Sequence, residues 1–204
     1  MESTAVAAAE ATGIRVLFVG TSLTAGLGLD PDSAYPAILQ RTADENGLQV
    51  TMVNAGLSGE TSAGALRRID WLLRDRADVV VLETGANDGL RGLNPDSTRA
   101  NLVAIIRKVR AADPQTRILL AQMEAPRNLG ARYTRDFRDT FLAVAQDEAV
   151  TLIPFFLVGV AAVAAMNQSD GIHPNEAGAR RAARNMWKAL FPVLRQVPGA
   201  IRVR

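Results

Sequence analysis

Residues 14–26 read IRVLFVGTSLTAG, and this stretch decides the fold. Its first six residues form an almost continuous apolar run, which is typical of a parallel β-strand that is covered on both faces. Small and polar residues follow, and Ser22 stands where a helix can begin. Free backbone N–H groups at such a turn favour developing negative charge. The stretch therefore predicts a buried strand that ends in a loop suited to chemistry.

Similar apolar runs recur along the chain and alternate with helical periodicity. Strands are predicted at 50–53, 79–82, 118–121 and, more weakly, 152–153, and helices at 35–46, 61–73, 97–112, 135–148 and after Pro174. Repeated alternation of strand and helix is typical of right-handed βαβ units. The pattern predicts an α/β fold in which a five-stranded parallel sheet carries helices on both faces.

Length and composition indicate one globular domain. The chain has 204 residues, of which 48% are hydrophobic and 22% charged, close to the average for globular proteins. We expect a flexible N-terminal segment at residues 1–13, a single domain at 14–197 and a C-terminal tail at 198–204.

Charge and cysteine content exclude several classes of protein. With 23 basic and 21 acidic residues the net charge is only +2, so no long-range field steers the chain to nucleic acid or anionic lipid. No apolar stretch is long enough to span a bilayer, so stable membrane insertion is not expected. The absence of cysteine excludes disulfides, a Cys-based zinc site and a thiol nucleophile.

The first dozen residues are small and Ala-rich, and they lack the basic start and apolar run of a signal peptide. We expect a periplasmic or secreted protein if a leader has been removed, and a cytoplasmic one otherwise. The sequence carries no signal for the oligomeric state.

Four loops are candidates for the functional site, because ligands of open parallel sheets bind beyond the carboxyl ends of the strands. Three of these loops, at residues 20–24, 54–59 and 85–89, follow the first three predicted strands directly. The fourth, at 170–174, holds the only histidine of the chain, His173. All four can converge on one edge of the sheet.

Ser22, His173 and Asp170 are candidates for a nucleophile, its base and the acid that orients the base. A serine nucleophile needs a base that ionises near neutral pH, and one histidine is present. Asp170 stands three residues before it, a spacing that can place the carboxylate beside one ring nitrogen and leave the other facing the serine. Ser22 could instead be an ordinary helix N-cap, and His173 a surface histidine held by a local aspartate.

Two further loop residues are candidates for an oxyanion hole. The Asn87 amide can donate a hydrogen bond without a charge that binds ground-state anions, and Gly59 lets the backbone N–H approach a substrate closely. Each is an ordinary turn residue when taken alone. Their placement after successive strands favours a shared site.

The four segments resemble, in order and spacing, the four motif blocks of the SGNH hydrolases, also called GDSL esterases and lipases. The resemblance extends from about residue 14 to about residue 193. The segments NDGLRG at 87–92 and DGIHPN at 170–175 are similar to those of the bacterial thioesterase, lysophospholipase and arylesterase branch. The resemblance implies a flavodoxin-like three-layer α/β/α sandwich.

The same resemblance implies roles for individual residues. Ser22 would be the nucleophile, His173 the base and Asp170 its orienting acid. The Ser22 N–H, the Gly59 N–H and the Asn87 side chain would form the oxyanion hole. One departure is Thr21, which stands where the family's first block has aspartate. Because threonine keeps a hydrogen-bonding oxygen, we expect a changed local network and only a small effect on kcat.

The implied activity is that of a serine esterase that works through an acyl-enzyme and needs no metal or organic cofactor. Its expected partners are small-molecule substrates: aryl or short-to-medium acyl esters, thioesters or lysophospholipids. Candidates for the acyl-binding surface are apolar residues in the loops beyond the third and later strands, with core packing as the alternative for each: Leu90, Leu93, Met123, Leu129, Phe155 and Phe156.

Other functions fit the sequence less well. A flavodoxin-like module without hydrolase activity could bind FMN or phosphate at residues 21–26, but aromatic residues to stack on a flavin are scarce, at 5%. A receiver domain would need an acidic pair after the first strand. An α/β-hydrolase would need a second glycine after Ser22, and a metal hydrolase more than one histidine or a carboxylate cluster.

Overall fold

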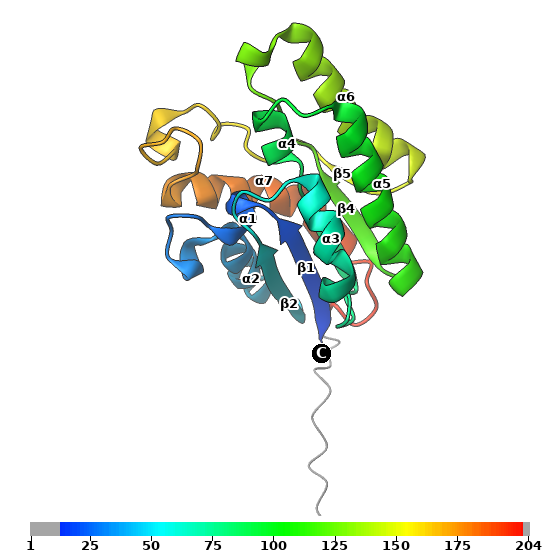
Figure 1. Cartoon of the computed structure of the whole chain (residues 1–204). Helices are drawn as coiled ribbons and strands as arrows, with labels where there is room; N and C mark the ends of the chain where they lie inside the picture. Colours follow the sequence, from blue (N-terminus) through cyan, green and yellow to red (C-terminus); the bar gives the residue numbers. More distant parts are fainter. Residues whose placement is uncertain (1–12, 202–204) are drawn as a thin grey trace, which may run out of the picture.

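The computed structural model describes residues 13–201 and contains one sheet of five strands (Figure 1). The strands are β1 (Ile14–Gly20), β2 (Val50–Gly56), β3 (Val79–Glu83), β4 (Arg117–Ala121) and β5 (Thr151–Ile153). All pairs are parallel, and the order across the sheet is β2-β1-β3-β4-β5. The predicted α/β class with a five-stranded parallel sheet is confirmed.

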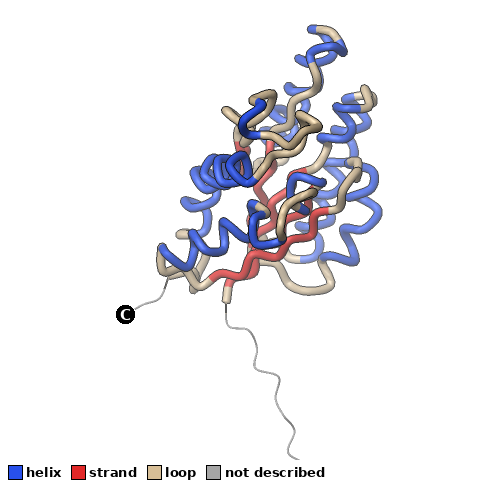
Figure 2. Tube along the Cα trace, turned by 90° about the vertical axis from the view of Figure 1, so that its left-hand side faces the viewer, coloured by secondary structure: helices blue, strands red, loops and turns tan. Residues whose placement is uncertain are grey.

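Helices cover both faces of the sheet. They are α1 (Ser22–Ala25), α2 (Tyr35–Glu45), α3 (Ser62–Leu72), α4 (Ala86–Leu90), α5 (Pro95–Ala112), α6 (Ala131–Asp147) and α7 (Glu176–Leu194), with short 3-10 turns η1 (Pro31–Ser33), η2 (Arg127–Leu129) and η3 (Ala164–Met166). Helices α3, α5 and α6 lie on one face and α2 and α7 on the other, so the layers alternate helix, strand, helix (Figures 1 and 2). The expected three-layer sandwich is confirmed.

Helix α5 illustrates why local sequence predicted most of these elements. The Asn94 side chain accepts a hydrogen bond from the Asp96 N–H, and Pro95 occupies the first turn, where its missing N–H costs nothing. The apolar side chains that recur at helical spacing are buried against the sheet: Leu102, Ile105, Ile106 and Val109. The periodicity missed α4, because a helix of five residues is too short to show it.

Strand register brings three of the predicted loops together. Gly20, the last residue of β1, is paired with Gly56 at the end of β2 and with Glu83 at the end of β3. The loops that follow these strands therefore start side by side at one edge of the sheet, as the topology of a parallel sheet requires.

The described part of the predicted C-terminal tail packs against the sheet. Ala200 is fully buried, and its carbonyl accepts a hydrogen bond from the Gln49 N–H at 2.9 Å. Ile201 forms a bridge with Leu48 just before β2. The N-terminal segment predicted at 1–13 lies outside the described residues except for Gly13. No helix within residues 13–201 is long and apolar enough to cross a membrane.

Candidate active site

Ser22 is the first residue of α1 and is separated from the end of β1 by one residue, Thr21. Thr21 is the N-cap of this helix, and its side chain accepts a hydrogen bond from the Leu23 N–H. The N-cap of α1 is thus Thr21, and not Ser22 as the sequence also allowed. Within residues 13–201 the Ser22 N–H makes no hydrogen bond, so it is free to meet a ligand.

His173 lies against Ser22 although 151 positions separate the two residues. Its Nε2 is 2.9 Å from the Ser22 Oγ, and its Nδ1 is 2.6 Å from an Asp170 carboxylate oxygen. The other Asp170 oxygen accepts hydrogen bonds from the Ile172 and His173 N–H groups at 2.9 and 3.0 Å. The three predicted residues therefore form a continuous chain of side-chain contacts.

The charge state of Asp170 determines which atoms donate and which accept in the hydrogen bonds between Asp170, His173 and Ser22. The hydrogen bond from the His173 side chain, followed by those from the backbone N–H groups, lowers the pKa of Asp170 to about 2. At neutral pH the carboxylate is ionised and can only accept. Nδ1 of His173 therefore carries a hydrogen and donates a hydrogen bond to Asp170. Nε2 is then left as the acceptor for the Ser22 hydroxyl.

Gly59 and Asn87 follow the ends of β2 and β3, the two strands that lie beside β1. Gly59 has φ +78° and lies in the turn closed by the hydrogen bond from the Glu60 N–H to the Leu57 carbonyl, a turn position that favours glycine. The Gly59 N–H makes no hydrogen bond within residues 13–201. The Asn87 amide donates one hydrogen bond to the Glu60 carbonyl at 2.9 Å, which leaves its second N–H for a ligand.

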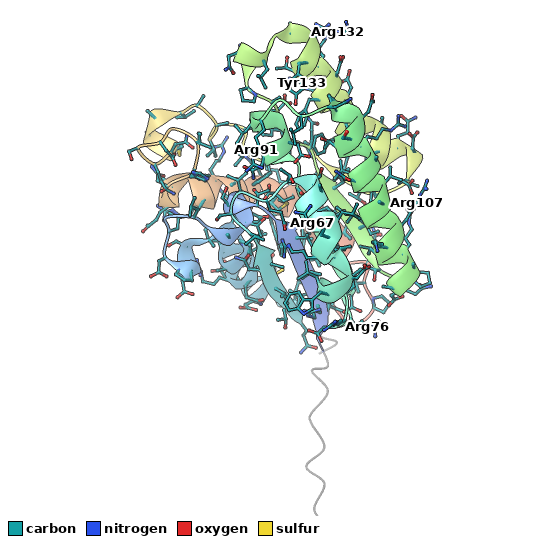
Figure 3. The ribbon with its side chains drawn as sticks, viewed as in Figure 1. Arg67, Arg76, Arg91, Arg107, Arg132 and Tyr133 are labelled. Carbon is teal, nitrogen blue, oxygen red and sulfur yellow. The ribbon has the colours of Figure 1, made fainter. Side chains whose placement is uncertain are left out.

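Two side chains that sequence analysis did not single out brace this region. The Asp88 carboxylate accepts from the Ser62 N–H at 2.8 Å and from the Ser62 hydroxyl at 2.5 Å, which ties α4 to the start of α3. The Arg91 guanidinium, at the end of α4, donates to the Gly59 carbonyl at 3.0 Å (Figure 3). The Arg91 contact holds the peptide group that follows Gly59, and the Asp88 contact holds the start of α3.

Glu83 is a third residue that sequence analysis missed. It ends β3 beneath Thr21, and its side chain is fully buried. Burial raises the pKa of Glu83 to about 7, an effect that outweighs the hydrogen bonds it accepts from Thr21 and Thr24. The sequence did contain a signal for Glu83, because an acidic residue at the end of a continuous apolar strand is unusual.

The raised pKa of Glu83 predicts a pH dependence of stability. Because the folded state binds the Glu83 proton more tightly than the unfolded chain, its stabilising effect is complete below pH 4.5 and is lost as pH rises to about 7. We expect this contribution to lower the free energy of unfolding by about 3 kcal/mol over that window. Urea unfolding at a series of pH values measures it. The slope should disappear in Glu83→Gln, and a slope that persists there would assign it to other groups.

The structure divides the six apolar candidates for the acyl-binding surface into two groups. Met123 and Phe156 are core residues, only 2% and 1% exposed, and Phe155 is half-buried against the core. Phe156 also lines a small pocket beneath Ser22 and His173. Leu90, Leu93 and Leu129 are exposed by 45%, 40% and 37%.

No group of three His, Asp or Glu side chains suited to a metal ion occurs in the described part of the chain.

Comparison with known proteins assigns the chain to a family. Residues 18–181 match the GDSL-like Lipase/Acylhydrolase family. The chain belongs to this family. It is 41% identical over 186 residues to Esterase TesA of Pseudomonas aeruginosa. The aligned region covers 91% of this chain and 92% of that protein. It is 37% identical to Thioesterase 1/protease 1/lysophospholipase L1 of Escherichia coli, over 88% of this chain and 84% of the other.

A solved structure, the crystal structure of TesA, superposes with a TM-score of 0.84 at 42% identity, covering 88% of this chain and 99% of that one. As a GDSL-like acylhydrolase with relatives named as esterases and a thioesterase, this protein is a carboxylic ester hydrolase. The predicted family resemblance and the predicted enzyme class are confirmed, and the FMN-binding alternative is not favoured.

Proposed function

We propose that this ester hydrolase cleaves aryl esters and short-to-medium acyl esters or thioesters through a Ser22–His173–Asp170 triad. One observation carries the proposal: Nε2 of the only histidine is 2.9 Å from Ser22 Oγ, while Nδ1 is 2.6 Å from Asp170. This geometry supports general-base activation of the serine hydroxyl.

The reaction follows from these contacts in two steps. Ser22 Oγ attacks the carbonyl carbon while His173 Nε2 accepts its proton, and Asp170 stabilises the imidazolium that forms. The tetrahedral intermediate collapses as His173 returns the proton to the leaving alcohol or thiol. Water, activated by the same histidine, then hydrolyses the acyl-enzyme and restores the Ser22 hydroxyl.

The negative oxygen of the intermediate would be held by three donors: the Ser22 N–H, the Gly59 N–H and the second Asn87 amide N–H. The two backbone donors make no hydrogen bonds within residues 13–201, and Asn87 is oriented by its bond to the Glu60 carbonyl. Donors fixed before the reaction begins stabilise the transition state without a reorganisation cost.

Replacement of Asn87 tests the oxyanion hole. We expect Asn87→Ala to lower kcat by on the order of 10²–10³, the usual loss for one donor, with KM little changed. Steady-state kinetics on a nitrophenyl ester measures both constants. Asn46→Ala, at the end of α2, is the matched control and should leave kcat unaltered. A rise in KM with constant kcat would mean that Asn87 only binds substrate.

The exposed leucines support an acyl-binding surface beside α4. Leu90 follows Asn87 by three residues on this helix, so the two side chains share a face. Leu129 approaches the turn after α4, where a Cβ on Gly92 would lie 3.7 Å from its side chain. Tyr133, on α6 beyond α4 (Figure 3), donates to the Leu93 carbonyl at 2.7 Å and fixes that segment.

Leu129→Ala tests this surface. Removing its apolar side chain should lower kcat/KM for octanoyl esters by about three- to tenfold and leave acetyl esters unaffected, because only the longer chain reaches it. Leu142→Ala on α6 is the matched control, since Leu142 is similarly exposed, at 42%. Equal losses on acetyl and octanoyl esters would contradict the assignment.

The substrate class is tested by a panel of nitrophenyl esters from acetyl to palmitoyl, run beside an acyl-CoA and a lysophospholipid. We expect kcat/KM to peak at short-to-medium chains. A peak at palmitoyl, or activity confined to the lysophospholipid, would overturn this substrate range.

A further inference from the structure

Glu83 lies directly beneath the turn that carries Ser22 and contacts the residues on both sides of it. One carboxylate oxygen accepts hydrogen bonds from the Thr21 N–H at 2.9 Å, the Thr24 hydroxyl at 2.7 Å and the Thr24 N–H at 3.3 Å. The other oxygen accepts from the Thr21 hydroxyl at 3.0 Å. No cation pairs with Glu83 in the described part of the chain, so these donors alone satisfy it.

The backbone is shaped to admit this carboxylate. A Cβ on Gly20 would lie 2.7 Å from the Glu83 carboxylate and 1.9 Å from the Thr24 hydroxyl, closer than real Cβ contacts. Only glycine at the end of β1 lets Glu83 and Thr24 meet. The register pairs Gly20 with Glu83, so the contact is fixed by the sheet itself.

We propose that Glu83 is a positioning residue for acyl transfer: through Thr21 and Thr24 it holds the Ser22 hydroxyl and N–H in the geometry for attack. This inference rests on the proposed function. Ser22 lies between the two threonines, so tying both to one acceptor fixes the turn on which its Oγ and N–H depend. A displacement of about 1 Å at a nucleophile can lower the rate by roughly 10²-fold, which gives such a contact a kinetic effect.

The same contact involves Thr21, which stands where the family's first block has aspartate. The Thr21 hydroxyl can donate to Glu83, whereas an ionised aspartate there would place a second acceptor against a buried carboxylate. A threonine at position 21 is therefore compatible with an ionised Glu83.

Tyr35 extends the hydrogen-bond network of Glu83 through Thr24. The Tyr35 hydroxyl, from α2, lies 2.7 Å from the Thr24 hydroxyl and is the titratable group that faces Glu83 from that side. Burial raises the pKa of Tyr35 well above 10, so it stays protonated. Thr24 has one hydroxyl proton and donates it to Glu83, so the Thr24 oxygen accepts the hydrogen bond from the Tyr35 hydroxyl.

Two substitutions at Glu83 separate positioning from general support of the fold. Glu83→Leu removes the acceptor, and we expect kcat on a nitrophenyl ester to fall by on the order of 10²-fold, with KM within about twofold. The rate at which a fluorophosphonate labels Ser22 should fall in parallel. In Glu83→Gln the amide oxygen can accept the three bonds and its N–H₂ can donate to the Thr21 hydroxyl, so kcat should fall by less than about threefold.

Val144→Ala, in the buried face of α6, is the matched control because it lowers the melting temperature without touching the turn. It should leave kcat unchanged. A Glu83→Leu enzyme that has only a lower melting temperature and unchanged kcat would overturn the proposal, as would a Glu83→Gln enzyme as impaired as Glu83→Leu.

If Glu83→Leu does not fold, Thr21→Val and Thr21→Ser decide the question. Valine keeps the shape but removes the hydroxyl, so kcat should drop by about three- to tenfold, while serine should restore most of it. Equal kcat in the two variants would overturn the proposal. Wild-type protein that neither hydrolyses esters nor labels at Ser22 would instead contradict the proposed function itself, a separate outcome.

Discussion

Ser22→Ala is expected to abolish fluorophosphonate labelling and to lower kcat by on the order of 10⁵–10⁶, because Ser22 is the proposed site of the acyl-enzyme. In the proposed mechanism the 2.9 Å contact with His173 Nε2 activates this hydroxyl, and its removal would leave only the proposed oxyanion donors and substrate binding. Intact-mass spectrometry after labelling and steady-state hydrolysis of a nitrophenyl ester measure the two effects.

Ser97→Ala, in the exposed first turn of α5, is the control and should retain both labelling and rate. Labelling that survives in Ser22→Ala would show that another residue is the nucleophile. Loss of hydrolysis together with loss of the folded state, seen by circular dichroism, would also fail to support the assignment, so the melting temperature is measured on both variants.

Asp170→Asn should be the next most damaging change, lowering kcat by about 10³–10⁴-fold. Asparagine can offer an N–H where the carboxylate accepted the His173 Nδ1 proton, which favours the tautomer with the proton on Nε2. That tautomer cannot accept the Ser22 proton. The hydrogen bond from the His173 side chain is the main cause of the lowered pKa of Asp170, and it is the contact that the substitution changes.

Asp113→Asn is the matched control, because Asp113 also accepts a backbone N–H in an exposed turn, from Gln115 at 2.8 Å, but lies away from Ser22. Its kcat should equal that of the wild type. The wild-type enzyme should lose the stability contributed by Asp170 as pH falls from about 4 to about 2, and Asp170→Asn should not. If the kcat of Asp170→Asn is within tenfold of wild type, Asp170 has no role in the reaction and only accepts the loop N–H groups of Ile172 and His173.

The sequence by itself determined the features that depend on neighbours along the chain. The apolar run at 14–19 predicted a buried strand, and the caps and periodicity around 97–112 predicted a helix, because each rests on local packing and hydrogen bonding. The approach of Asp170 to His173 was predictable for the same reason, since three residues of turn suffice to join them.

Tertiary structure alone decided the contacts between distant segments. Met123 resembled a loop residue open to an acyl chain, yet the path of the chain after β4 buries it in the core. The bond from Asn87 to the Glu60 carbonyl, and the burial of Glu83 beneath Thr21, depend on which strands are neighbours. Glu83 and Thr21 are 62 positions apart, and it is the register of β1 with β3 that brings them together. Periodicity encodes which face of a strand is buried but not which strand lies beside it, so the contacts of Glu83 with the residues around Ser22 became visible only in the folded chain.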